Sequence, residues 1–151
     1  YLRARRAAQA GYVAGWVQAR QVQEPTGKLV VLGDFNASEF DDGHADLLGL
    51  VTGRPTARGK VLAFLGSPVA SPLTNMTTRL PKPERYTVTR DGNAQAVDHI
   101  LVNGAFLQAS PAAKVAVARI NADFGEDNLG DAGVPMRVSD HDPVVLTFDL
   151  R

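Results

Sequence analysis

The chain has 151 residues, 44% of them hydrophobic, which suits one domain with a buried core and excludes a disordered chain. Its 16 basic and 16 acidic residues give a formal net charge of zero, which excludes the strongly basic surface of a stable, non-specific nucleic-acid binder. Cysteine is absent, so disulfides and thiolate metal sites are excluded, and no apolar run approaches the ~20 residues of a membrane-spanning helix.

Residues 2–23 are expected to form an amphipathic helix. Val13, Trp16 and Val17 recur at helical spacing, and Tyr12 widens this apolar stripe. Arginines along the same segment can face water. Because the chain starts inside this helical pattern and without a methionine, we expect it to be a piece of a longer protein.

Residues 28–32 (KLVVL) are a short apolar run bounded by turn residues, which predicts a strand buried on both faces. Gly33 lets the backbone turn, so Asp34 and Asn36 are expected to project beyond the carboxyl end of this strand. Asp and Asn at a strand end are equally typical of a purely local turn. Both interpretations therefore stay open for this pair.

The middle of the chain is less regular. Residues 44–50 predict one or two helical turns, and residues 51–83, rich in Gly, Pro, Ser and Thr, predict a long surface excursion. Residues 84–102 predict a β-hairpin, because Asp91 and Gly92 are a strong turn signal between two alternating runs.

Two further strands are predicted near the end of the chain, over residues 113–120 and 143–150, separated by a polar, acidic loop over residues 121–138. The order of helix, strand, loop, hairpin and two strands predicts an α/β (α+β) fold. We expect a mixed, mostly antiparallel sheet with the first helix on its flank and loops collected at one end.

The polar residues at the strand ends suit cleavage of a phosphate ester, a reaction that needs charge neutralisation and deprotonation of water. Asp34 could take a proton from water, and Asn36 could donate a hydrogen bond to the phosphorane without changing its own charge. His141 could hold a phosphoryl oxygen if a buried carboxylate kept it charged. Asp98 is the candidate for that carboxylate, since an Asp within an apolar strand needs a partner.

Asp140 would then be free to face a divalent cation. Carboxylates without cysteine favour Mg²⁺ or Mn²⁺, hard ions that prefer oxygen ligands. Ca²⁺ is a weaker alternative, because the spacing of the acidic residues within 121–138 matches no EF-hand loop and is more typical of a solvated loop. The acidic residues of that loop are Asp123, Glu126, Asp127 and Asp131.

Simpler roles remain for several of these residues. Taken alone, His141 is more typical of a hydrogen-bonded structural histidine, and His99 and His44 are better explained by local structure than by catalysis. Asp142 and Pro143 are expected to set the start of the last strand.

Together, three motifs resemble the endonuclease/exonuclease/phosphatase superfamily, which has the deoxyribonuclease-I-like fold. They are GDFN at 33–36, VDHILV at 97–102 and SDHDPV at 139–144, and they occur in the family's order and beside similar strands. The segments YTV…DGNAQAVDHILV and ARINADF are most similar to bacterial secreted nucleases. The resemblance therefore implies metal-dependent hydrolysis of phosphodiester bonds. It also favours an extracellular location, with a cytoplasmic one left open.

The resemblance also implies a role for each matching residue. Asp34 orients or deprotonates the attacking water, and Asn36 contacts the phosphate. Asp98 pairs with His141, which binds the scissile phosphate. Asp140, with Asp34, contributes to the region of the Mg²⁺ or Mn²⁺ ion.

Substrate contacts are also plausible just before the second motif. We hold Asn93 as a candidate substrate-binding residue on this ground, together with Arg85, Tyr86 and Gln95.

Two other functions stay open beside the nuclease. One is a phosphatase acting on a phosphomonoester, an inositol phosphate or a phospholipid, and the other is a non-catalytic interaction module.

The superfamily domain consists of two similar halves packed sheet against sheet, and the resemblance covers only its second half. We expect residues 1–151 to be that C-terminal half, with the N-terminal half absent. One sheet face would then be bare, so we expect the other half or a second chain to cover it. We also expect the isolated chain to hydrolyse its substrate weakly, because the resemblance places the principal metal carboxylate in the other half.

Overall fold

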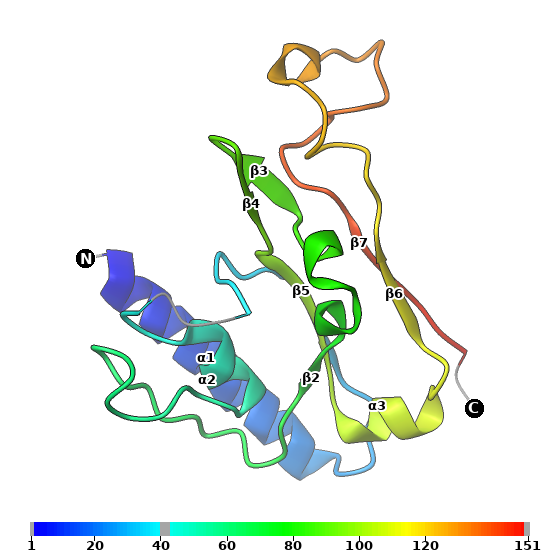
Figure 1. The fold of residues 1–151 in the computed structure, drawn as a ribbon. Helices are drawn as coiled ribbons and strands as arrows, with labels where there is room; N and C mark the ends of the chain where they lie inside the picture. Colours follow the sequence, from blue (N-terminus) through cyan, green and yellow to red (C-terminus); the bar gives the residue numbers. More distant parts are fainter. Residues whose placement is uncertain (1, 40–42, 150–151) are drawn as a thin grey trace.

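The computed structural model describes residues 2–39 and 43–149 (Figure 1). The helices and strands, in chain order, are α1 (Leu2–Gln23), β1 (Val30–Asp34), α2 (Leu47–Thr52), β2 (Thr74–Asn75), β3 (Val88–Arg90), β4 (Asn93–Gln95), β5 (Asp98–Val102), α3 (Gly104–Ala109), β6 (Lys114–Val117) and β7 (Val144–Thr147). Three short 3₁₀ turns are η1 (Met76–Arg79), η2 (Lys82–Glu84) and η3 (Glu126–Asn128). The predicted α+β class, with antiparallel sheets and a flanking first helix, is confirmed.

The central sheet has the strand order β1-β5-β2, and its strands pair antiparallel. In the β1–β5 register, Asp34 lies directly opposite Asp98, and Leu32 lies opposite Ile100. Residues directly opposite one another share a face of the sheet. Asp34 at the end of β1 and Asp98 at the start of β5 therefore project to the same side.

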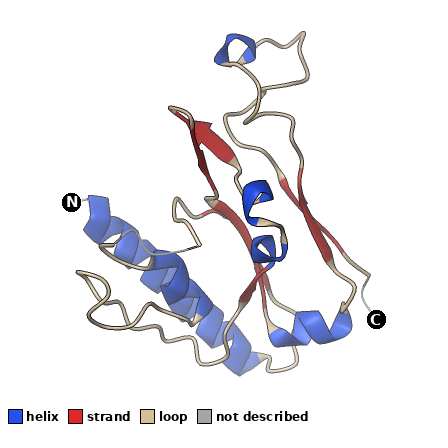
Figure 2. Cartoon of the chain, viewed as in Figure 1, coloured by secondary structure: helices blue, strands red, loops and turns tan. Residues whose placement is uncertain are grey.

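Two separate ribbons, β3-β4 and β6-β7, flank the central sheet (Figure 2). An isolated bridge between Val88 and His141 joins the first ribbon to the segment before β7. The backbone N–H of Asp142 also donates to the carbonyl of Thr87 at 2.7 Å. These long-range bonds bring the C-terminal segment to the end of the central sheet where Asp34 and Asp98 lie.

The two faces of the sheet are covered by different parts of the chain. On one face Leu101 packs with Ala14 and Val17 of α1. On the other, Ile100 and Val102 form a second cluster with neighbours that include Phe106, Met76 and residues of β6 and β7. Among the described residues, no helix is long and apolar enough to span a membrane.

The first helix is confirmed, but part of its predicted apolar face is wrong. Val17 is buried, whereas Tyr12 is 78% exposed and Trp16 is 48% exposed. The buried stripe runs through Ala14 and Val17 instead, because α1 presents these residues to the sheet and to α2. The size and apolarity of the side chains alone therefore did not identify the face of α1 that packs against the sheet.

The expectation of a first strand buried on both faces is also wrong. The strand spans Val30–Asp34, two residues later than predicted, and Leu32 in its centre is 69% exposed. The physical reason is that side chains of a strand project from alternate faces of the sheet, and the described part of the chain leaves the face at Leu32 uncovered. The helix α1 covers the face of Val31 and leaves the face of Leu32 open.

The predicted hairpin is confirmed in its turn and wrong in its length. Asp91 and Gly92 adopt positive φ angles of 50° and 75°, as a tight hairpin turn requires, and join β3 to β4. The returning run then breaks before Asp98, and β5 pairs with β1 and β2 instead of continuing the hairpin. The strands β6 and β7 lie inside the ranges 113–120 and 143–150, and position 150 lies outside the described residues.

Candidate active site

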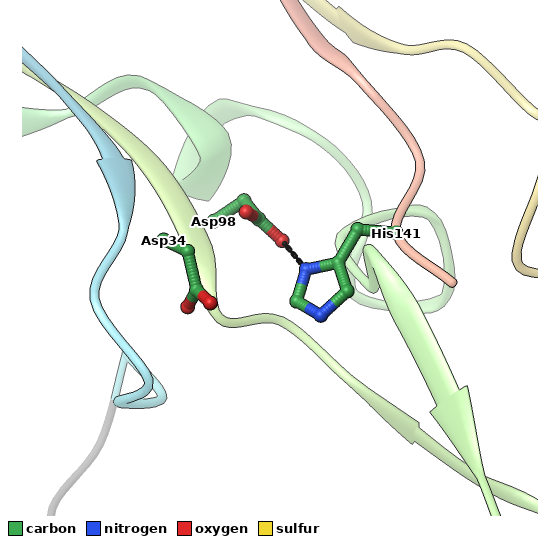
Figure 3. Close-up of side chains that lie close together, drawn as sticks. All are labelled: Asp34, Asp98 and His141. Atoms are coloured by element: carbon green, nitrogen blue, oxygen red, sulfur yellow. Dashed lines mark hydrogen bonds and ion pairs between the residues drawn. The ribbon is translucent and has the colours of Figure 1, made fainter. Parts of the chain in front are cut away.

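Three side chains from distant parts of the sequence meet at the end of the central sheet. Asp34 ends β1, Asp98 begins β5, and His141 comes from the segment before β7 (Figure 3). Each offers one oxygen or nitrogen atom, and these atoms all lie within 4.8 Å of one another. The edge of the sheet therefore carries two carboxylates and an imidazole at one point.

Asp98 and His141 form a direct pair. The Nδ1 atom of His141 lies 2.8 Å from Oδ2 of Asp98, and both side chains are less than one-fifth exposed. The backbone bridge from Val88 to His141 holds the imidazole against the strand. A carboxylate that accepts from Nδ1–H fixes the ring orientation and leaves Nε2 facing the site.

A buried threonine completes the environment of Asp98. The hydroxyl of Thr87, which is fully buried, donates to the same Oδ2 atom at 2.5 Å. It also accepts the backbone N–H groups of Val97 and Asp98, each at 3.3 Å. Thr87 thus orients the carboxylate that orients His141. No sequence pattern indicated this role, because a threonine just before a strand is ordinary.

Asp34 and Asn36 are held together by local bonds. The backbone N–H of Asn36 donates to Oδ1 of Asp34 at 2.7 Å, and the Asn36 amide donates to Oδ2 at 3.0 Å. Asn36 has a φ of 46°, in the left-handed region that Asn tolerates better than most residues. The side chain of Arg6 donates to its carbonyl. The local turn left open by the sequence is therefore present, and it lies beside the other two side chains.

Of the other predicted site residues, Asp140 lies at the edge of this group of three and Asn93 lies apart from it. Asp140 is exposed, with Oδ2 3.5 Å from Nη2 of Arg90 and 3.8 Å from Nε2 of His141. Asn93 is exposed on the β3–β4 hairpin, where its amide donates to the carbonyl of Asp91 at 3.4 Å. Their predicted roles in metal and substrate binding stay predictions.

Asp142 lies next to His141 but faces away from it, into the protein. Its Oδ1 atom accepts backbone N–H groups from Ile120, Asn121 and Ala122 at 2.7–3.1 Å, and its Oδ2 atom accepts from Arg119 at 3.0 Å. Burial alone would raise the pKa of this carboxyl, but these donors outweigh burial and hold the pKa below its ordinary value. Asp142 therefore anchors the segment that carries His141.

Arg85 and Tyr86, considered as substrate contacts, have partners within the chain. The Arg85 guanidinium contacts Glu39 at 2.8 Å and also donates to the carbonyls of Thr78 and Leu80. Tyr86 donates its hydroxyl to Asp123 at 2.6 Å, and this hydrogen bond, together with burial, raises the pKa of the phenol. These contacts give both side chains a structural role.

Two cavities adjoin the exposed strand β1. One, of about 530 Å³, is lined by Asp34 and Asn36 together with Arg6 of α1. The other, of about 390 Å³, is lined by Asp98 and His141 and by apolar side chains. The space beside the three site residues is therefore large enough for a phosphate group.

The three side chains fit a hard divalent cation. Two carboxylates come from directly opposed positions of neighbouring strands, and Asp34 is exposed. Carboxylate oxygens are the ligands that Mg²⁺ and Mn²⁺ prefer. The sequence predicts Asp34 and Asp140 as metal ligands; Asp34 lies within this group of three, Asp140 lies at its edge, and the metal role of both stays a prediction.

Comparison with known proteins supports the same chemistry. The family model described as Endonuclease/Exonuclease/phosphatase family matches residues 6–141, which is most of the chain and includes all three site residues. No curated protein and no solved structure matches the chain. Members of this family hydrolyse phosphate-ester bonds and typically use divalent metals. With a match over residues 6–141, the chain belongs to the endonuclease/exonuclease/phosphatase family.

Proposed function

We propose that this chain forms the catalytic centre of a metal-dependent phosphodiesterase, with nucleic acid as its substrate. The observation that supports this most strongly is the convergence of Asp34, Asp98 and His141 within 4.8 Å. Such a centre can place a proton acceptor and a cationic donor on one phosphate.

His141 binds a phosphoryl oxygen in this proposal. Its Nδ1 atom is engaged by Asp98, so Nε2 is the ring nitrogen available to a substrate. When the imidazole is charged, Nε2–H donates to an oxygen whose negative charge grows in the transition state. Thr87 and Asp98 keep the ring oriented for this contact.

Asp34 accepts a proton from the attacking water. Asp34 is exposed, whereas Asp98 and His141 are partly buried, so water reaches Asp34 directly. Each of its oxygens accepts one hydrogen bond from Asn36 and has a further lone pair for a water proton. Asn36 would move its amide from Asp34 to the phosphate when substrate binds.

Asp34 and Asp98 are the residues that would hold a divalent cation, with Asp140 near the outer side of His141. When bound, a Mg²⁺ or Mn²⁺ ion supplies positive charge that neutralises the phosphate. The carboxylates and the imidazole of this chain orient the water and the phosphate around that charge.

A direct test uses the purified chain with Mn²⁺ and three substrates: bis(p-nitrophenyl) phosphate, p-nitrophenyl phosphate and plasmid DNA. We expect slow hydrolysis that favours the two diesters and is abolished by EDTA. Asp34→Asn should remove the activity, and Asp127→Asn, which changes an exposed acidic residue of η3, is the matched control. Activity that survives Asp34→Asn would contradict the proposal, and activity on the monoester alone would favour a phosphatase.

We also propose that a further sheet-forming segment or a second chain covers the open side of β1. Leu32, Ile120 and Val138 line the cavity beside Asp98 and His141, and they are 69%, 41% and 64% exposed. Exposed apolar side chains gathered at one groove are typical of a contact surface. Light scattering tests this, and a stable, monodisperse monomer with no tendency to associate would count against it.

A further inference from the structure

His99 lies on the face of β5 opposite to Asp98. Its ring is only 1% exposed, and its backbone is paired with Gly33 of β1. The Nε2 atom lies 2.8 Å from the carbonyl oxygen of Ala37, and the Nδ1 atom lies 3.0 Å from the amide nitrogen of Asn75. The ring therefore joins the loop after β1 to the end of β2.

The neighbours of the ring determine which nitrogen carries the proton. The Oδ1 atom of Asn75 accepts from the backbone N–H of Thr77 at 3.2 Å and from its hydroxyl at 2.7 Å, which turns the Asn75 NH₂ group toward His99. Nδ1 of His99 must then accept, so Nε2 carries the hydrogen and donates it to Ala37. Burial also lowers the pKa of this imidazole and favours its neutral form.

The carbonyl that His99 holds belongs to the residue after Asn36. On the other side of Asn36, the N–H of Phe35 donates to the carbonyl of Val97 at 2.9 Å. The residues on both sides of Asn36 are therefore fixed, one to β5 and the other to the residue before it, while the φ of Asn36 is 46°. Asn tolerates this conformation better than most residues, and the contacts on both sides hold the loop in it.

We propose that His99 is a positioning residue for hydrolysis, acting through Asn36 by donating its Nε2–H to the Ala37 carbonyl. This inference rests on the proposed function, in which Asn36 contacts the phosphate. The hydrogen bonds run from η1 through Asn75 and His99 to Ala37. Buried polar side chains therefore set the geometry of the loop that carries Asn36.

If the His99 ring served only to fill the core, replacing it by another aromatic ring would leave hydrolysis unchanged. His99→Phe keeps an aromatic ring and removes the donor to Ala37, whereas His99→Gln supplies an amide N–H at a similar distance from the backbone. We expect His99→Phe to lower the turnover of bis(p-nitrophenyl) phosphate about tenfold to a hundredfold, through kcat more than KM. We expect His99→Gln to recover most of this loss.

A double-mutant cycle separates positioning from general stability. If His99 acts through Asn36, His99→Phe should have little further effect once Asn36→Ala has removed the amide. An equal fold-loss in both backgrounds would overturn the proposal. Failure of His99→Gln to exceed His99→Phe in turnover, with equal thermal unfolding, would overturn it as well.

Nuclear magnetic resonance tests the same arrangement without any hydrolysis. In ¹⁵N spectra at pH 7 we expect His99 to carry its proton on Nε2, with slow exchange of that proton with water. We also expect the Asn36 backbone amide to shift in His99→Gln less than in His99→Phe. A proton on Nδ1, or a rapidly exchanging Nε2 proton, would overturn the positioning role even if hydrolysis is found. If no hydrolysis is found, the proposed function fails, and these spectra still decide the arrangement.

Discussion

The two halves of the site are built differently. Asp34 and Asn36 are exposed and bonded to each other across two residues of sequence. Asp98 and His141 are largely buried, lie 43 residues apart and are hydrogen-bonded to each other, and the fully buried Thr87 donates to Asp98. The geometry of the first half depends on a local turn, and that of the second depends on the tertiary fold. We therefore expect substitutions in the first half to lower activity alone, and substitutions in the second half to lower both activity and stability.

The largest effect is expected for the exposed half. Asp34→Ala should lower turnover by about 10²–10⁴-fold, because it removes the proton acceptor. The free energy of unfolding should change by no more than about 0.5 kcal/mol, since the side chain is exposed and its bonds are local. Phosphodiester hydrolysis and urea unfolding measure the two quantities, and a large loss of stability would break the comparison.

Asp98→Ala should affect both quantities. It leaves Thr87 and His141 without their shared acceptor, so we expect a loss of activity of about 10²-fold or more and a destabilisation of about 1–3 kcal/mol. Thr87→Val should show the same pattern more weakly, with Thr87→Ser as the control that keeps the hydroxyl. If Asp98→Ala lowered activity and left the free energy of unfolding unchanged, the two halves would not differ as proposed.

Asp142 tests the fold-dependent half through pH. Its pKa is lowered in the folded protein, so its contribution to stability is present above the unfolded value of about 3.9 and is lost as pH falls through the folded pKa. We expect Asp142→Asn to cost about 1–3 kcal/mol at pH 7. The difference from the unmodified chain should shrink below about pH 4, as followed by thermal unfolding between pH 3 and 7. A difference independent of pH would contradict the role of the charge.

The smallest effect is expected for the exposed pair of Arg90 and Asp140. These side chains are 57% and 52% exposed and 3.5 Å apart, and such pairs contribute little to stability. Arg90→Ala should change the free energy of unfolding by no more than about 0.5 kcal/mol. A comparison of DNA cleavage with cleavage of a small diester would show whether Arg90 contributes to binding of a longer substrate.

Much of the fold followed from local pattern. The helix over 2–23, the turn at Asp91 and Gly92 and the last two strands were predictable, because periodicity and turn chemistry act over a few residues. The exposure of Leu32 and Tyr12 was not, because it depends on which face of the sheet is covered and which helical face meets the sheet.

The site divides in the same way. The residue types and their places at strand ends identified Asp34, Asp98 and His141 in the sequence, and the structure places them together. Thr87 and His99 could not be assigned a supporting role, because their hydrogen-bond partners come from segments that only tertiary packing brings near. From the sequence, Asp98 was assigned to His141 and Asp140 to the metal region; the structure shows the contact between Asp98 and His141, and the metal role of Asp140 stays a prediction.

The central claim is that Asp34, Asp98 and His141 act on one bound group. Titration of the ¹⁵N-labelled chain with Mn²⁺ tests it directly, because paramagnetic broadening depends on distance from the ion. We predict that the His141 ring and the amides of Asp34 and Asp98 broaden together at the lowest Mn²⁺ concentrations, and that Asp34→Ala removes the broadening at His141. Broadening confined to the acidic loop around Asp127, or unchanged at His141 in Asp34→Ala, would contradict the account.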